Sequence, residues 1–327
     1  MSLSKWGYLF SVVVCLAWSL VLPPAVAAGD IESSLDTPPL KIDFNDVVEN
    51  KTSHLSENGH LELKIAVAAM ISPKYTYKYY VDLLNLIGDL TDRTVRFIQK
   101  KTYAEINDMI GRNEIDLAFV CSGPYVSGKK KFGMQILAVP LCHGEKEYYS
   151  YFITSKAGNI RSFDELRGRT FAFTDPLSNS GYVVPTYILA LRGETPETFF
   201  KKTFFTHSHD NSIQAVADGL ADGAAIDSLI YNFIQAKSPE ITKKTIIVDK
   251  SPPYGIPPIV VSPKIDAGLK KKLKNIFLSI HKYPQAKTIL DNLQIDRFIE
   301  GNDDDYDTVR EMQNFINTNY DAEEKIP

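Results

Sequence analysis

The chain has 327 residues, a formal net charge of −4 and only three cysteines. A polyanionic partner such as nucleic acid would require a basic patch, and the two lysine triplets, at 129–131 and 270–272, are typical of solvated surface. Composition therefore excludes nucleic-acid binding. The length exceeds one ordinary hydrophobic core and predicts two lobes.

Residues 1–28 have the pattern of a secretory signal peptide. Lys5 supplies an early positive charge, an apolar run covers 9–22, and small residues of the A-x-A type end the segment. The alternative is a membrane anchor, but the apolar run is shorter than the ~20 residues that span a bilayer. Cys15 lies inside the apolar run, which argues against a lipid-anchored start. We predict export to the periplasm.

A polar segment at 29–60 is expected to be a flexible leader with little structure. After it, strand and helix patterns alternate through the first half of the chain. Strands are predicted at 63–68, 94–99 and 115–120, a turn at 70–73, and helices at 77–90 and 103–112. This alternation predicts a parallel sheet with helices on both faces.

The same alternation restarts after residue 148. Strands are predicted at 170–174, 204–207, 224–226 and 245–248, and helices at 162–166, 181–192, 213–220 and 228–236. A strand at 259–261 returns to the first lobe, and helices at 267–282 and 305–318 complete the chain. The predicted fold is therefore α/β, with two doubly wound lobes joined by two crossings. The first lobe comprises 61–147 and 251–327, and the second comprises 148–250.

A serine-rich loop follows the strand at 170–174. In open α/β sheets ligands bind beyond the carboxyl ends of the strands, which is where this loop lies. Ser178 and Ser180 offer hydroxyl donors, Asn179 offers an amide, and Gly181 allows close approach of the backbone. Because the loop opens a helix, it is suited to an anion; an ordinary capped loop is the alternative.

Several ordered motifs across roughly 61–300 resemble the phosphate/phosphite/phosphonate binding-protein family of ABC transporters. They are Asp175-Pro176-x-Ser178-x-Ser180-Gly181, Ser208-His209-Asp210, Ala225-Ile226-Asp227-Ser228, Tyr103-Ala104-Glu105, Ile115-Asp116-Leu117-Ala118-Phe119 with Gly123-Pro124-Tyr125, and Phe163-Asp164-Glu165-Leu166-Arg167-Gly168. The resemblance implies a periplasmic binding protein type II fold, in which the serine-rich loop holds the phosphorus oxyanion. That loop usually reads Ser-Thr-Ser, whereas Asn179 stands in the middle here, which leaves the exact ligand open.

His209 is the second candidate, and the family resemblance assigns it as a donor to the ligand. A histidine near a helix N-terminus is biased towards the neutral form, which still donates one hydrogen bond. A capping or packing role is the alternative. A second alternative is a metal site formed by His209 and His207. No third ligand is spaced nearby, so we expect no metal.

Asp227 is the third candidate. An ionised carboxylate only accepts hydrogen bonds, so beside an anion it would select a ligand oxygen that carries a proton, or an amino group on the ligand. The resemblance supports this role. A helix N-cap for the segment that begins at Ser228 is the alternative, and the two roles can coexist.

The first lobe offers weaker candidates in Ser122, Tyr125 and Tyr75, which follow predicted strands. Tyrosine can donate a phenolic hydrogen bond and form a wall of the cleft. Cys121 and Cys142 remain after cleavage of the signal peptide, and the sequence leaves open whether they form a disulfide.

Catalytic patterns are missing from the sequence. It contains no G-x-S-x-G elbow, P-loop or H-E-x-x-H motif. Ser178, His209 and Asp227 would resemble a triad only if the histidine bridged the other two. We therefore expect no catalysis and no cofactor. The predicted protein is a monomeric solute receptor for an ABC permease and ATPase; the alternative is an extracytoplasmic sensor that works with a separate membrane signalling partner.

Overall fold

The structure is a computed structural model that describes residues 41–43 and 61–323. The predicted signal peptide and most of the predicted leader lie outside the described residues. Within the leader, Lys41–Asp43 forms strand β1 and pairs in parallel with β3 (Thr94–Ile98). These three residues are the part of the predicted leader that the structure describes, and they extend a sheet; the prediction of little structure over the rest of 29–60 stays a prediction.

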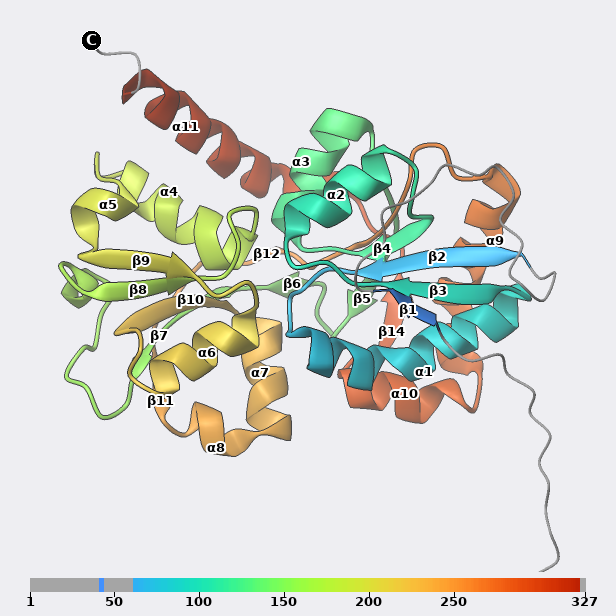
Figure 1. The fold of residues 1–327 in the computed structure, drawn as a ribbon, viewed down its shortest axis with the longest axis horizontal. Coiled ribbons are helices and arrows are strands. Elements are labelled where there is room, and N and C mark those ends of the chain that lie inside the picture. The colour runs from blue at the N-terminus through green and yellow to red at the C-terminus, as the bar shows by residue number, and fades with distance from the viewer. Residues whose placement is uncertain (1–40, 44–60, 324–327) are drawn as a thin grey trace, which may run out of the picture. The chain divides into compact units, whose positions relative to one another are not determined.

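The first lobe contains a seven-stranded sheet (Figure 1). Its order is β1, β3, β2 (Glu62–Val67), β4 (Leu117–Phe119), β13 (Ile259–Val261), β5 (Gln135–Leu141) and β14 (Arg297–Ile299). β1 to β4 are parallel to one another, but β13 is antiparallel to β4 and β5, and β14 is antiparallel to β5. The sheet is therefore mixed rather than parallel throughout. The predicted return of 259–261 to this lobe is confirmed.

Helices cover both faces of this sheet, as predicted (Figure 1). One face packs on α1 (Pro73–Thr91), α9 (Ala267–Ser279) and α10 (Ala286–Leu293), and the other on α2 (Tyr103–Gly111) and α3 (Ser122–Phe132). The alternation of side chains along a strand produces the two layers. Ile65 and Val67 pack with the α1 side, whereas Ala66 packs with the α2 side.

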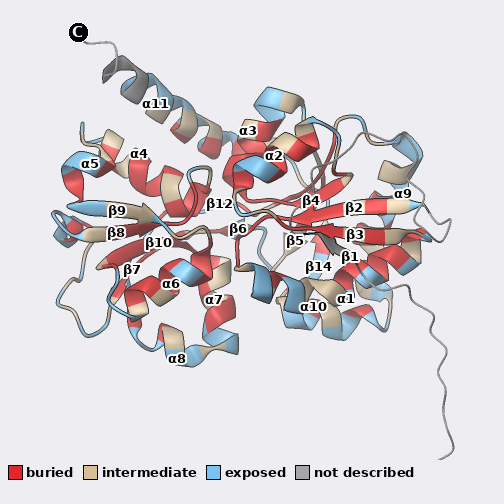
Figure 2. Ribbon diagram, in the orientation of Figure 1, coloured by how far each residue is buried: buried red, intermediate tan, exposed pale blue. Residues whose placement is uncertain are grey.

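The second lobe contains a five-stranded sheet. Its order is β11 (Thr245–Lys250), β7 (Ser150–Ser155), β10 (Gly223–Asp227), β8 (Thr170–Phe173) and β9 (Lys202–Phe205). β8, β9 and β10 are parallel, and β7 is antiparallel to β10 and β11. Helices α6 (His209–Ala217), α7 (Ser228–Lys237) and α8 (Pro239–Thr242) lie on one face, and α4 (Val184–Ala190) and α5 (Pro196–Phe199) on the other. Figure 2 shows buried residues along the strands of both sheets.

Two short strands connect the lobes. β6 (Glu147–Tyr148) and β12 (Tyr254–Gly255) pair antiparallel where the chain leaves the first sheet and where it returns. The C-terminal helix α11 (Asp307–Glu323) contacts α3 through Gln313 and Ser127. It also contacts α4 in the second lobe, where the rings of Phe315 and Tyr187 lie 5.4 Å apart. The final segment therefore touches both lobes.

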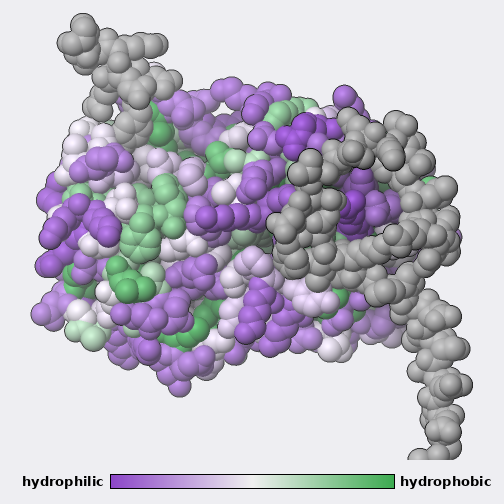
Figure 3. Space-filling view, in the orientation of Figure 1, coloured by the Kyte–Doolittle hydropathy of each residue, from purple (hydrophilic) through white to green (hydrophobic). Residues whose placement is uncertain are grey.

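A few large apolar side chains are exposed on the described surface. Large exposed apolar side chains, among them Leu220, Leu191 and Ile247, are separated in sequence. Figure 3 shows a mainly hydrophilic face with small hydrophobic patches. Among residues 41–43 and 61–323, no helix is both long and apolar enough to cross a bilayer.

Candidate functional site

The serine-rich loop begins where β8 ends and runs into a π-helical turn at Asn179–Val183, which continues as α4. The helix thus begins two residues before the predicted start at Gly181. Ser178 is its N-cap, and its Oγ accepts a hydrogen bond from Gly181 N at 3.1 Å. A Cβ on Gly181 would lie 2.4 Å from Thr174 Oγ1, so only glycine lets the loop close on the end of the strand.

His209 lies against this loop and is fully buried. Its Nδ1 accepts a hydrogen bond from Asp227 N at 3.2 Å and lies 3.1 Å from Thr174 Oγ1. Because Nδ1 is an acceptor, Nε2 carries the proton of the neutral ring, and Nε2 faces Ser178 Oγ at 3.4 Å. Burial lowers the pKa of His209 to about 3. The ring is therefore a neutral donor, as the sequence predicts, although burial rather than the helix dipole is the cause.

Several buried polar atoms beside the loop have no hydrogen-bond partner among the described residues. They are Asn179 Oδ1, Ser180 Oγ, Tyr103 Oη and Ser208 Oγ. Buried polar atoms are almost always paired in folded proteins, so a group of unpaired ones marks a candidate binding site for a polar ligand. Sequence reasoning missed Tyr103 as a site residue. It packs with Leu177, next to Ser178, and the motif Tyr103-Ala104-Glu105 was the signal that could have found it.

Asp227 ends β10 and caps α7. Its Oδ1 accepts hydrogen bonds from Leu229 N at 2.7 Å and from Ile230 N at 3.4 Å, so the predicted capping role is confirmed. Burial raises the pKa of Asp227 to about 7. Below that pH the carboxyl group is largely protonated and can also donate. The sequence analysis considered only the ionised form of Asp227, which accepts.

The three weaker candidates make other contacts. Tyr125 Oη donates to Asp303. Ser122 Oγ donates to Gly255 O at 2.7 Å, and the ring of Tyr75 stacks on Tyr79 with centroids 6.2 Å apart. The hydroxyl groups of Tyr125 and Ser122 are therefore used in contacts within the protein.

Residues of both lobes meet around the serine-rich loop. Tyr103 N donates to Asp175 Oδ2 at 3.2 Å, Ser72 N to Asp210 Oδ1 at 2.8 Å, and His209 N to Met70 O at 3.0 Å. Tyr148, on the crossing strand β6, accepts from Asn179 Nδ2 at 3.0 Å. These contacts enclose a set of polar groups that we call the polar cluster: Tyr103, Ser178, Asn179, Ser180, Ser208, His209 and Asp227.

For the described part of the chain the sequence predicts no metal, and it leaves the pairing of the two cysteines open. No three His, Cys, Asp or Glu side chains gather there as a metal would require. Cys121 and Cys142 are free thiols rather than a disulfide. Burial raises the pKa of Cys121 to about 11 and that of Cys142 to about 12, which keeps both protonated at neutral pH.

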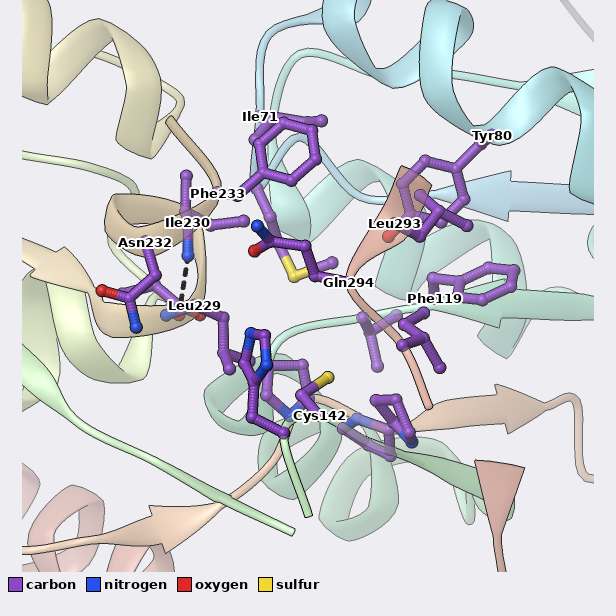
Figure 4. A pocket seen from close by; sticks show the side chains of 18 of the residues that line it. Ile71, Tyr80, Phe119, Cys142, Leu229, Ile230, Asn232, Phe233, Leu293 and Gln294 are labelled. Carbon is purple, nitrogen blue, oxygen red and sulfur yellow. Dashed lines mark hydrogen bonds between the residues drawn. The ribbon is translucent and has the colours of Figure 1, made fainter. Parts of the chain in front are cut away.

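An apolar cavity of about 100 Å³ adjoins the polar cluster (Figure 4). In Figure 4, Leu229, Ile230 and Phe233 come from α7 of the second lobe, and Tyr80 and Phe119 from the first. Asp227 belongs both to the lining of this cavity and to the polar cluster.

Two α/β lobes joined by two crossing strands, with buried polar groups between them, define a periplasmic binding protein of type II. Two solved structures share this fold. A binding protein component of an ABC phosphonate transporter from Pseudomonas aeruginosa has a TM-score of 0.76 and 23% identity, over 80% of this chain and 89% of that chain. PhnD1 from Prochlorococcus marinus (MIT 9301), solved in complex with methylphosphonate, has a TM-score of 0.72 and 22% identity, over 78% of this chain and 98% of that chain.

The sequence places the chain in a particular family within this class. The family model described as "ABC transporter, phosphonate, periplasmic substrate-binding protein" matches residues 65–306, and the chain belongs to this family. The phosphonates-binding periplasmic protein of Escherichia coli (strain K12) is 26% identical over 196 residues. That match covers 58% of this chain and 58% of the relative, so the chain spans less than two thirds of the relative's length. The resemblance inferred from the motifs is confirmed.

Proposed function

We propose that the protein captures a phosphate-like oxyanion (a phosphonate, phosphite or phosphate) in the periplasm and delivers it to an ABC permease and ATPase. The observation that carries this proposal is a group of buried polar atoms in the polar cluster that no described residue pairs, above all Ser180 Oγ and Tyr103 Oη. Family membership supports the same assignment. We propose a monomer that reaches the periplasm through the signal peptide at 1–28.

The polar cluster can hold an oxyanion through neutral donors. Ser178 Oγ accepts a hydrogen bond from Gly181 N and faces the protonated nitrogen of His209, Nε2. Because both neighbours are donors, the hydroxyl proton of Ser178 is free to point towards a ligand. Ser180 and Tyr103 add two more hydroxyl donors. Hydrogen bonds from such donors to a charged oxygen are shorter and stronger than those between neutral groups.

The same geometry argues against a hydrolase. A catalytic triad needs an imidazole nitrogen that accepts the serine proton and a carboxylate that accepts from the other nitrogen. Here Nδ1 of His209 accepts from the backbone N–H of Asp227, so the proton lies on Nε2, the nitrogen that faces Ser178. The carboxyl group of Asp227 caps α7 instead. We therefore propose binding without catalysis.

We also propose that the two lobes, 61–147 with 251–327 and 148–250, move about the crossing strands β6 and β12. Hinge closure around a ligand is a common motion of two-lobed binding proteins. Small-angle scattering with and without ligand tests the motion, and the radius of gyration is expected to decrease on binding. An unchanged radius at saturation would indicate a rigid, preclosed site.

Isothermal titration tests the proposed ligand class. The protein is titrated with phosphate, phosphite, methylphosphonate and 2-aminoethylphosphonate, with sulfate as a fully ionised control. At least one phosphorus oxyanion is expected to bind more tightly than sulfate, because Asp227 disfavours an anion without a proton. Absence of binding by all four phosphorus compounds contradicts the proposal.

A further inference from the structure

A second recess between the lobes is lined by polar and charged side chains. Its volume is about 410 Å³, which is within the range of sites that hold small molecules. None of the residues that line the apolar cavity lines this recess. We call it the lysine groove and define it by Gln99, Lys100, Lys101 and Glu105 of the first lobe and by His207 and Ser208 of the second.

Three polar atoms of the lysine groove are buried and have no hydrogen-bond partner within 41–43 and 61–323. They are Gln99 Oε1, His207 Nδ1 and Ser208 Oγ. Gln99 is 6% exposed and Ser208 is 1% exposed, so both side chains are shielded from bulk water. Gln99 Nε2 donates to Pro73 O at 3.2 Å, and because that carbonyl only accepts, Oε1 is the amide atom left over. The groove therefore contains a buried acceptor that a donor on a ligand would satisfy.

The charges of the lysine groove favour an anion. Lys100 and Lys101 line it, and neither forms an ion pair or a hydrogen bond with a residue that the structure describes. Glu105 is the one carboxylate among the described lining residues. Its Oε2 already accepts from Thr102 N at 2.9 Å and from Thr102 Oγ1 at 2.8 Å, in the capping box of α2. The two lysines are thus left without a carboxylate partner.

We propose that the lysine groove binds a small hydroxycarboxylate, an organic acid that carries both carboxylate and hydroxyl groups. Its carboxylate groups contact Lys100 and Lys101, and its hydroxyl group donates to Gln99 Oε1. An acid without a hydroxyl group satisfies the lysines but leaves the buried oxygen of Gln99 without a donor. The inference goes beyond the proposed function and does not depend on it, because neither Gln99 nor the two lysines belong to the polar cluster.

Isothermal titration with L-malate and succinate tests the inference. The two acids have the same carbon chain and the same two carboxylates, and they differ by one hydroxyl group. L-malate is expected to bind about 2- to 12-fold more tightly than succinate, which is the net effect of one hydrogen bond. Absence of L-malate binding, or equal affinity for the two acids, overturns the inference.

Gln99→Leu tests the acceptor. The variant replaces the amide by an apolar side chain of similar size, so the advantage of L-malate over succinate is expected to disappear. The ratio of the two affinities is the readout, because a general disturbance of the groove would weaken both acids alike. A folded Gln99→Leu variant that keeps the parent ratio shows that the hydroxyl group does not contact Gln99, and the inference is overturned.

A matched pair of double variants tests the charges. Lys100→Gln with Lys101→Gln removes both lysines of the groove. Lys130→Gln with Lys271→Gln removes two exposed lysines that do not line it, so the net charge changes equally. The first pair is expected to weaken both acids by about 2- to 30-fold, the scale of two ion pairs near the surface. Equal affinities in the two double variants overturn the inference.

Competition separates the lysine groove from the polar cluster. L-malate is expected to bind the protein whether or not methylphosphonate is present at saturation. If L-malate and methylphosphonate displace each other from one site, the acid lies in the polar cluster and the inference is overturned. If no phosphorus oxyanion binds, the proposed function fails, whereas the titrations with L-malate and succinate still decide the inference.

Discussion

The polar cluster and the apolar cavity are neighbours with opposite chemistry. In the cluster, buried polar atoms such as Ser180 Oγ and Tyr103 Oη have no partner among the described residues. In the cavity, side chains such as Phe119 and Phe233 offer nothing to hydrogen-bond. Asp227 belongs to both, because its backbone N–H contacts His209 and its side chain lines the cavity.

The proposed function uses only the first of these two regions. Unpaired buried donors favour a ligand that supplies acceptors, and this selects the oxyanion. Apolar walls, in contrast, stabilise a bound group only through the apolar area that they remove from water. A change in the polar cluster is therefore expected to alter affinity for every oxyanion that the protein binds.

Removal of the loop hydroxyls is expected to have the largest effect on the polar cluster. Ser178→Ala and Ser180→Ala should each weaken oxyanion binding by roughly 1.5–3 kcal/mol, or about 10- to 150-fold, the scale of a hydrogen bond to a charged group. Ser178→Ala should also lower the free energy of unfolding by ~1 kcal/mol, because Ser178 caps the helix. Ser180→Ala should leave folding nearly unchanged. Titration and chemical denaturation measure both effects; parent-like binding in both variants would place the anion elsewhere.

Two buried tyrosines provide a matched comparison between an unpaired and a paired hydroxyl. Tyr103→Phe removes a hydroxyl that has no partner within 41–43 and 61–323, whereas Tyr125→Phe removes one that donates to Asp303. Tyr103→Phe should weaken binding by about 1.5–3 kcal/mol with little change in stability. Tyr125→Phe should lower stability by ~0.5–1.5 kcal/mol and leave affinity unchanged. If titration shows the reverse, Tyr125 is the ligand-binding tyrosine, as the sequence alone suggested.

Gly123→Ala tests whether the polar cluster needs the lobes to meet. A Cβ at Gly123 would lie 2.2 Å from Leu177 O and 3.1 Å from Asn179 N. Such overpacking typically costs ~1–3 kcal/mol, so affinity should fall by about 5- to 150-fold. Gly158→Ala is the control, because its Cβ would lie at an ordinary 3.4 Å from Ser155 O. Scattering should show that ligand compacts the control but not Gly123→Ala; full compaction of both would remove the steric argument.

The pH dependence of Asp227 is expected to be the smallest effect at neutral pH. Its pKa is raised to about 7, and a phosphate-type ligand has a second pKa near 6. One proton shared between them avoids repulsion, so parent affinity should fall above pH 7, by at most about tenfold per pH unit for the uptake of one proton. Asp227→Asn keeps the helix cap and should flatten the profile. Binding titrations of the parent and the variant from about pH 5.5 to 8.5 test this expectation. If the two profiles of affinity against pH are parallel, Asp227 acts only as a helix cap.

Much of the fold follows from local pattern, and the misses have physical reasons. The strands at 63–68 and 170–174 and the helix at 103–112 agree with β2, β8 and α2 to within a residue or two. Helix α3 was not predicted, because glycine and proline in its first turn conceal the pattern. The expectation of a parallel sheet is wrong at β13, and strand β14 was not predicted at all, because pairing between distant strands is not encoded in the local periodicity.

The sequence by itself determined the family and the two-lobed α/β class, and it supplied most of the residues of the proposed site, Ser178 to Gly181 with His209 and Asp227. Those residues lie in short motifs after strands, where local order is enough to recognise them. Only the tertiary structure decided that Tyr103 rather than Tyr125 has an unpaired hydroxyl, that Nε2 of His209 carries the proton, and that an apolar cavity adjoins Asp227. The reason is that burial, tautomer and cavity shape arise where segments distant in sequence pack together.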